Sequence, residues 1–232
     1  MAADGLPVPK SLPASLALPA LVFDMDGVLI DSNPAHRRAW EAFNRRYGLE
    51  TTESMHESMY GKRNDDIVRN FFGELPAEEV RARGAAKEVL YREMIGGRVE
   101  DMLVPGVRPF LERHAALPKA LASNAEPDNI HFLLDRARLR GYFRVVVDGG
   151  QVRHPKPDPE LYLLAARLLG VAPADCVVFE DSYAGVAAGN AAGMRVVGVL
   201  TTHSHLPGAA LSVHNFLSRE LEAWLMAQVR PT

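Results

Sequence analysis

Short apolar runs recur along this chain, and most of them are followed by a turn and then by a helical pattern. The runs are ALVF (20–23), KALA (119–122), VVV (145–147), CVVF (176–179) and RVVGV (195–199). Uninterrupted apolar runs of this length are typical of strands that are buried on both faces. Because strands that alternate with helices favour parallel pairing with right-handed crossovers, we expect an α/β fold built on a parallel sheet.

One interval breaks this alternation. Residues 33–101 hold only helical patterns, among them SNPAHRRAWEAFNRRYG and ELPAEEVRARGAAKEVLYREMIGG, with Gly84 as a candidate break between two helices. We therefore predict a flexible, Pro- and Ala-rich leader (1–19), an α/β core (20–32 and 102–232) and a small all-helical domain (33–101) inserted after the first strand. The hinges are expected near residues 32–33 and 101–105.

Composition narrows the class of protein without identifying it. Hydrophobic residues make up 47% and charged residues 24% of the 232 positions, as in soluble globular proteins, and the net charge of -3 gives no footprint for nucleic acid. The single cysteine, Cys176, excludes an internal disulfide and suits a reducing compartment. No apolar run approaches the roughly 20 residues that span a bilayer. We predict a cytoplasmic monomer without nucleic-acid or membrane partners.

Polar side chains follow the apolar runs, at the sheet edge where parallel sheets bind ligands. These residues are Asp24, Asp26, Ser123, Asn124, Asp148, Glu180 and Asp181, with Lys156 in the loop HPKPDP. Carboxylates this close together repel one another and are costly to bury unless they are neutralised. The stretch LVFDMDGVLIDS therefore indicates that something cationic binds there. Asp148, in the turn DGG, is expected to be structural.

Four segments resemble, in order, the four motifs of the haloacid dehalogenase-like phosphotransferases: DMDGVLIDS, SNAEP, KPDPELY and FEDSYAG. The likeness covers about residues 21–200 and is closest to the branch of β-phosphoglucomutases and hexose-phosphate phosphatases. It implies a Rossmann-like core with a helical cap domain, and a Mg²⁺-dependent phosphatase that acts on a small phosphorylated metabolite, with a sugar phosphate as the expected substrate. The alternative is a β-phosphoglucomutase, which interconverts β-glucose 1-phosphate and glucose 6-phosphate with the same core.

The resemblance also implies roles for the residues at the strand ends. Asp24 is expected to be the nucleophile that forms an aspartyl-phosphate, and Asp26 the general acid and base. The residues expected to bind phosphate are Ser123, Asn124 and Lys156. The ligands expected for Mg²⁺ are Asp24, the main-chain carbonyl of Asp26, Glu180 and Asp181.

In the cap, four positions resemble residues that contact the substrate: His36, Lys62, Arg63 and Lys87. His36 matches a hinge histidine that steadies the acid/base residue in the mutase branch, with ordinary helix surface as the alternative. Arg63 could clamp a second phosphate or a sugar hydroxyl, with a solvated loop as the alternative for Arg63 and Lys62. The mutase pattern has arginine one position later, where this chain has Asn64, which favours the phosphatase.

Other functions on this fold agree less well with the sequence. A non-catalytic binding module would be expected to lack Asp24, Lys156 or Asp181, and all three are present. The dehalogenases and phosphonate hydrolases of the superfamily lack the second aspartate of the pair, which is Asp26 here. The HSH stretch at 203–205 is expected to be a surface loop.

Overall fold

A computed structural model describes residues 16–17, 19–228 and 230–231. Its centre is a six-stranded sheet in the order β4-β3-β2-β5-β6-β7, in which every neighbouring pair is parallel. The strands are β2 (Ala20–Phe23), β3 (Lys119–Ala122), β4 (Val145–Val147), β5 (Cys176–Glu180), β6 (Arg195–Val199) and β7 (Leu211–Val213). The predicted α/β parallel sheet is confirmed. The apolar pattern does not predict β7, an edge strand in which only Val213 is buried.

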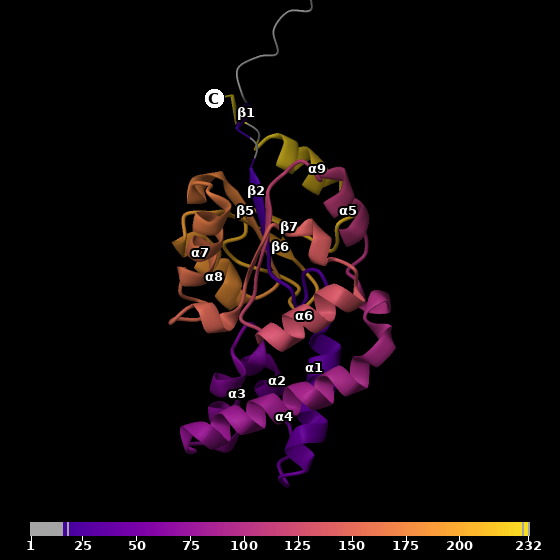
Figure 1. The fold of residues 1–232 in the computed structure, drawn as a ribbon, viewed down its shortest axis with the longest axis vertical. Coiled ribbons are helices and arrows are strands. Elements are labelled where there is room, and N and C mark those ends of the chain that lie inside the picture. Colours follow the sequence, from indigo (N-terminus) through magenta and orange to yellow (C-terminus); the bar gives the residue numbers. More distant parts are fainter. Residues whose placement is uncertain (1–15, 18, 229, 232) are drawn as a thin grey trace, which may run out of the picture.

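Helices cover both faces of this sheet (Figure 1). One face carries α7 (Glu160–Leu169) and α8 (Tyr183–Ala191); the other carries α5 (Val107–Arg113), α6 (Pro127–Arg136) and α9 (Arg219–Met226). The side chains of β2 alternate accordingly, with Ala20 and Val22 toward α7 and α8, and Leu21 and Phe23 toward the other three helices. Burial on both faces explains why the strand sequences are apolar throughout.

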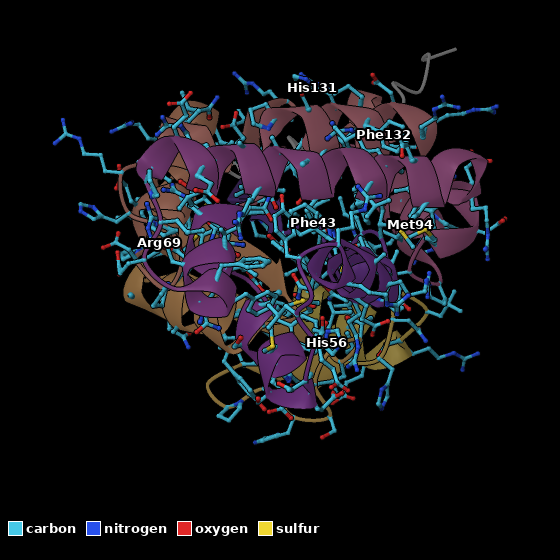
Figure 2. All side chains as sticks on the ribbon, turned by 90° about the horizontal axis from the view of Figure 1, so that it is seen from below. Phe43, His56, Arg69, Met94, His131 and Phe132 are labelled. Atoms are coloured by element: carbon cyan, nitrogen blue, oxygen red, sulfur yellow. The ribbon has the colours of Figure 1, made fainter. Side chains whose placement is uncertain are left out.

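Between β2 and α5 the chain forms four α-helices, all within residues 33–101, the range of the predicted insertion. They are α1 (Asn33–Arg45), α2 (Glu53–Met59), α3 (Asn64–Phe72) and α4 (Ala77–Ile95). They enclose a small apolar core of their own, and Figure 2 shows Phe43 near the middle of this layer. Ile30 and Leu103, on the two connections to the sheet, form an antiparallel bridge. The two connections therefore run side by side.

The predicted break at Gly84 is wrong, because α4 runs through Gly84 without interruption and is 19 residues long in all. Gly84 is buried, and a Cβ atom at this position would lie 3.1 Å from the Cβ atom of Asn64. The glycine therefore allows α4 to approach the start of α3 closely, and the packing gained there offsets its poor helix propensity.

The end of the predicted leader takes part in a second, two-stranded sheet. β1 (Leu16–Ala17) pairs antiparallel with β8 (Arg230–Pro231), whereas residues 1–15 and 18 of the leader lie outside the described residues. Short 3₁₀ turns complete the chain at Gly96–Arg98, Glu100–Met102, Arg140–Tyr142, Gly149–Gln151 and Pro173–Asp175. Among the described helices, none combines the length and apolar character that crossing a membrane requires.

Candidate active site

A cavity of about 80 Å³ is lined jointly by the carboxyl ends of the strands and by the helical insertion. The predicted site residues that line it are Asp24, Asp26, Ser123, Asn124, Lys156 and Asp181 from the sheet side, and His36, Lys62 and Lys87 from the insertion. Glu180 is buried beside them at the end of β5 and is not part of the lining.

Lys156 connects two buried carboxylates. Its ammonium group donates to Asp24 Oδ1 and to Glu180 Oε1, each at 2.6 Å. Glu180 Oε1 also accepts from the Tyr162 hydroxyl, and Glu180 Oε2 accepts from the main-chain N–H groups of Asp181 and Ser182. Both Glu180 oxygens are therefore already engaged. Among the described residues, none donates a hydrogen bond to the second oxygen of Asp24, which leaves it free to react.

A third carboxylate completes an acidic cluster. One oxygen from each of Asp24, Glu180 and Asp181 lies within 4.8 Å of the others. Asp181 comes close to the chain at Gly27, where φ is +76° and a Cβ atom would lie 1.9 Å from Asp181 Oδ2. Only glycine fits this left-handed turn against the carboxylate. Asn33 fixes Asp181 from the insertion by a hydrogen bond of 3.0 Å to the same oxygen.

The charges in this cluster are only partly balanced. Burial raises the pKa of Asp24 to about 7, although Lys156 opposes the shift, and burial together with Glu180 raises the pKa of Asp181 well above its usual range. Burial also disfavours ionised Glu180, but Lys156 and Tyr162 outweigh it and lower the pKa of Glu180. The ammonium group of Lys156 thus pairs with two of the three buried carboxylates, Asp24 and Glu180, and the hard oxygen donors of the cluster fit Mg²⁺.

Asp26 is held by residues at the start of α1. Its Oδ1 accepts from the Ser32 hydroxyl and lies 3.5 Å from His36 Nε2, while His36 Nδ1 lies 2.9 Å from Lys87 Nζ. Because an ammonium group can only donate, His36 Nδ1 is the acceptor and the imidazole proton is on Nε2, toward Asp26. Burial would favour neutral Asp26, but the hydrogen bonds from His36 and Ser32 outweigh it and lower its pKa. The predicted hinge histidine therefore contacts Asp26.

A family model provides the deciding comparison: the model for haloacid dehalogenase-like hydrolases matches residues 18–193. The chain belongs to this family. The hydrolase is 36% identical to the fructose-1-phosphate phosphatase of Escherichia coli over 182 residues, covering 77% of this chain and 95% of the relative. It is 34% identical to a phosphorylated carbohydrates phosphatase of Thermotoga maritima over 228 residues, covering 91% and 94% of the two chains.

A solved structure agrees with this assignment. The β-phosphoglucomutase of Clostridium difficile superposes with a TM-score of 0.81 at 26% identity, covering 91% of this chain and 98% of that one. The hydrolase is therefore an enzyme of the phosphatase or phosphohexomutase kind, as its sequence motifs predict.

Arg63 does not lie where the sequence suggested. It is outside the lining of the cavity, and its guanidinium group donates to the main-chain carbonyls of Gly149 and Val152, the latter at 2.8 Å. The side chain is thus held by the loop after β4, which carries carbonyl groups that need donors. Its contacts tie the insertion to the core and do not support a clamp on the substrate.

Several residues that support the site were not predicted. Thr202 donates from its hydroxyl to Asp181 and receives a hydrogen bond of 2.6 Å from Asn33. It follows the apolar run at 195–199, so the rule that pointed to the other strand ends could also have found Thr202. Tyr162 and Glu88 gave no such signal, because both lie within ordinary helical patterns and reach the site only through tertiary packing.

Proposed function

We propose that this hydrolase is a Mg²⁺-dependent phosphomonoesterase that releases phosphate from a small sugar phosphate through an aspartyl-phosphate at Asp24. The observation that carries the proposal is the buried Asp24–Lys156 pair beside a cavity that Asp26 also lines. The names of the Escherichia coli and Thermotoga maritima relatives, which specify fructose 1-phosphate and phosphorylated carbohydrates, support the substrate class.

In the first step, the free oxygen of Asp24 attacks phosphorus and the bond from phosphorus to the ester oxygen breaks. Asp26 gives its proton to that leaving oxygen. The negative charge of the bound ester raises the proton affinity of Asp26, which His36 and Ser32 keep ionised in the free enzyme.

In the second step, Asp26 takes a proton from a water molecule as the water oxygen attacks phosphorus. The bond from phosphorus to Asp24 then breaks, and inorganic phosphate and the free carboxylate are regenerated. Throughout both steps the ammonium group of Lys156, with Ser123 and Asn124, neutralises and orients the phosphoryl oxygens.

Asp24, Asp181 and the main-chain carbonyl of Asp26 would hold Mg²⁺, with Glu180 as a further predicted ligand beside them. When bound, the ion supplies positive charge that reduces the repulsion between the carboxylates and the phosphoryl group. Because Lys156, Tyr162 and two N–H groups already occupy the oxygens of Glu180, Asp24 and Asp181 offer the freer donors.

We also propose that residues 33–101 act as a cap on the core formed by residues 20–32 and 102–232. Residues of the insertion line the cavity together with core residues. The Asn124 amide of the core donates to the main-chain carbonyl of Gly61 at 2.8 Å, and Arg63 reaches the loop after β4. Substrate entry then requires these contacts to open.

Product analysis tests the proposed reaction. With Mg²⁺ and fructose 1-phosphate we expect stoichiometric fructose and inorganic phosphate. With β-glucose 1-phosphate and a trace of the 1,6-bisphosphate, we expect no glucose 6-phosphate ahead of phosphate. Accumulation of glucose 6-phosphate without phosphate would instead identify a mutase, the candidate that the His36–Lys87 contact and the likeness to a β-phosphoglucomutase favour.

Removal of the metal gives a second test. Dialysis against EDTA should lower the rate of phosphate release by about 100-fold or more, because the acidic cluster then repels the phosphoryl group. Added Mg²⁺ should restore the rate and raise the melting temperature, since the ion binds the folded site and not the unfolded chain. EDTA saturated with Mg²⁺ is the control. A fully active, metal-free protein would contradict the proposal.

A further inference from the structure

The part of the cavity formed by α3, α4 and α6 carries an anionic wall, which consists of Asn64, Glu88 and Asn129. The amide groups of both asparagines donate to Glu88, Asn64 to Oε1 at 2.7 Å and Asn129 to Oε2 at 2.5 Å. Arg92 fixes Asn129 by donating to its Oδ1. Glu88 is only 3% exposed, so its carboxylate belongs to the cavity lining and not to the outer surface.

The carboxylate of this wall is ionised and pairs with Lys87 at 2.7 Å. Burial would favour neutral Glu88, but the ammonium group of Lys87 outweighs burial and lowers the pKa of Glu88 to about 2. A second carboxylate, Glu126, lies one hydrogen bond away, because the Asn64 amide also donates to Glu126 Oε1 at 2.9 Å. Two carboxylates thus share one neutral amide at this end of the cavity.

The two buried lysines of the lining are already paired with carboxylates. Lys87 donates to Glu88 at 2.7 Å and to His36, and its ammonium group lies 5.0 Å from the centre of the Trp40 ring. Lys156 is taken by Asp24 and Glu180 on the sheet side. The remaining lysine of the lining, Lys62, is exposed. Among the described residues of the lining, every buried ammonium group is therefore already paired, and a phosphate placed against the wall would have to displace Lys87 from Glu88 or draw the exposed Lys62 out of water.

The same wall is well suited to hydroxyl groups. An ionised carboxylate accepts about four hydrogen bonds, and Glu88 receives three from protein groups, two on Oε1 and one on Oε2. One acceptor position on Oε2 is therefore left for a ligand. A hydroxyl group can donate to it, whereas a phosphate dianion has no proton to offer.

We propose that Asn64, Glu88 and Asn129 form a specificity wall that binds hydroxyl groups of the substrate remote from its phosphate and rejects a second phosphate. The inference rests on the proposed function and narrows its substrate to neutral polyol or sugar monophosphates. Rejection of a sugar bisphosphate also separates this enzyme from a mutase. A mutase must keep the bisphosphate bound while the phosphoryl group returns to the enzyme, whereas this site would not hold it, so that hydrolysis is the remaining outcome.

Matched pairs of esters test the wall. Steady-state phosphate release is measured for fructose 1-phosphate and glucose 6-phosphate, and for the bisphosphate of each sugar, with p-nitrophenyl phosphate as a reporter of the core chemistry. For whichever of the two monophosphates has the higher kcat/KM, the wild-type value should exceed that of the corresponding bisphosphate by about 100-fold or more. In Glu88→Gln this preference should fall to about tenfold or less, because the neutral side chain leaves Lys87 uncompensated.

The controls separate specificity from folding. Glu79→Gln, on the same helix but paired with Arg83, should keep the wild-type preference. If Glu88→Gln does not fold by circular dichroism, Asn64→Lys at the half-buried start of α3 serves in its place, since the ammonium group would neutralise Glu88 and Glu126.

The outcomes are distinct. The proposed wall would be overturned if a folded variant kept the wild-type ratio of kcat/KM between monophosphate and bisphosphate. An equal fall of kcat/KM for both esters would have the same meaning. In either case, phosphate release by the wild-type enzyme would still support the proposed function. A wild-type preference for the bisphosphate would also overturn the wall. Failure of the wild-type enzyme with p-nitrophenyl phosphate and every sugar ester would overturn the proposed function and, with it, the wall.

Discussion

Asp24→Asn should abolish turnover, with kcat for phosphate release reduced by about 10⁴-fold or more. The amide keeps the size of the side chain and removes the oxygen nucleophile, so the aspartyl-phosphate cannot form. The fold should remain intact. Burial already raises the pKa of Asp24 to about 7, so a neutral group at this position costs little. Rates would be measured by phosphate release, and folding by circular dichroism and thermal unfolding.

Asp148→Asn is the matched control for this variant. Asp148 also follows a strand of the sheet, but its side chain accepts from the main-chain N–H of Gly150 and is not among the residues that line the cavity. Its replacement should leave kcat within about twofold of the wild-type value. If Asp24→Asn retained more than a hundredth of the wild-type rate, covalent catalysis by this residue would be ruled out.

The strand ends could be predicted from the sequence because two simple rules coincide there. A buried parallel strand must be apolar on both faces, and ligands bind where such strands end. ALVF is therefore followed by Asp24, and CVVF by Glu180 and Asp181, and the structure gathers these residues in one cluster. The helical insertion was equally visible, because no apolar run interrupts residues 33–101.

Features that depend on contacts between distant segments could not be predicted in this way. A helical pattern does not reveal that α4 lies against α3, so Gly84 suggested a break although it permits close packing. For the same reason the helical pattern around Glu88 gave no sign that α3 and α6 bury this residue in the cavity wall. Arg63 resembled a substrate clamp because charge alone does not show which carbonyl groups a side chain reaches.

Lys156→Met should affect both activity and stability. The variant removes the ammonium group from between Asp24 and Glu180, which are buried and would then face each other without compensation. Breaking a buried ion pair by removing one partner costs about 3–5 kcal/mol. The loss of charge at the phosphoryl group should also lower kcat/KM by about 10³-fold. Lys119→Met is the matched control, because Lys119 is also buried but donates to main-chain carbonyls.

The pH dependence identifies the cause of this destabilisation. In the wild-type enzyme the pKa of Glu180 is lowered, so its contribution to stability is present above the unfolded value near 4.5 and is lost as the pH falls through the folded value. In Lys156→Met the pKa of Glu180 should rise, and the penalty should be greatest near pH 7 and shrink toward pH 4. Denaturant unfolding at both pH values measures the difference.

Adding Glu180→Gln to the Lys156→Met variant should recover stability near pH 7 without recovering activity, because the buried charge is gone while the phosphate still lacks its cation. A pH-independent loss, or recovery of both properties, would show that Lys156 acts through packing and not through charge.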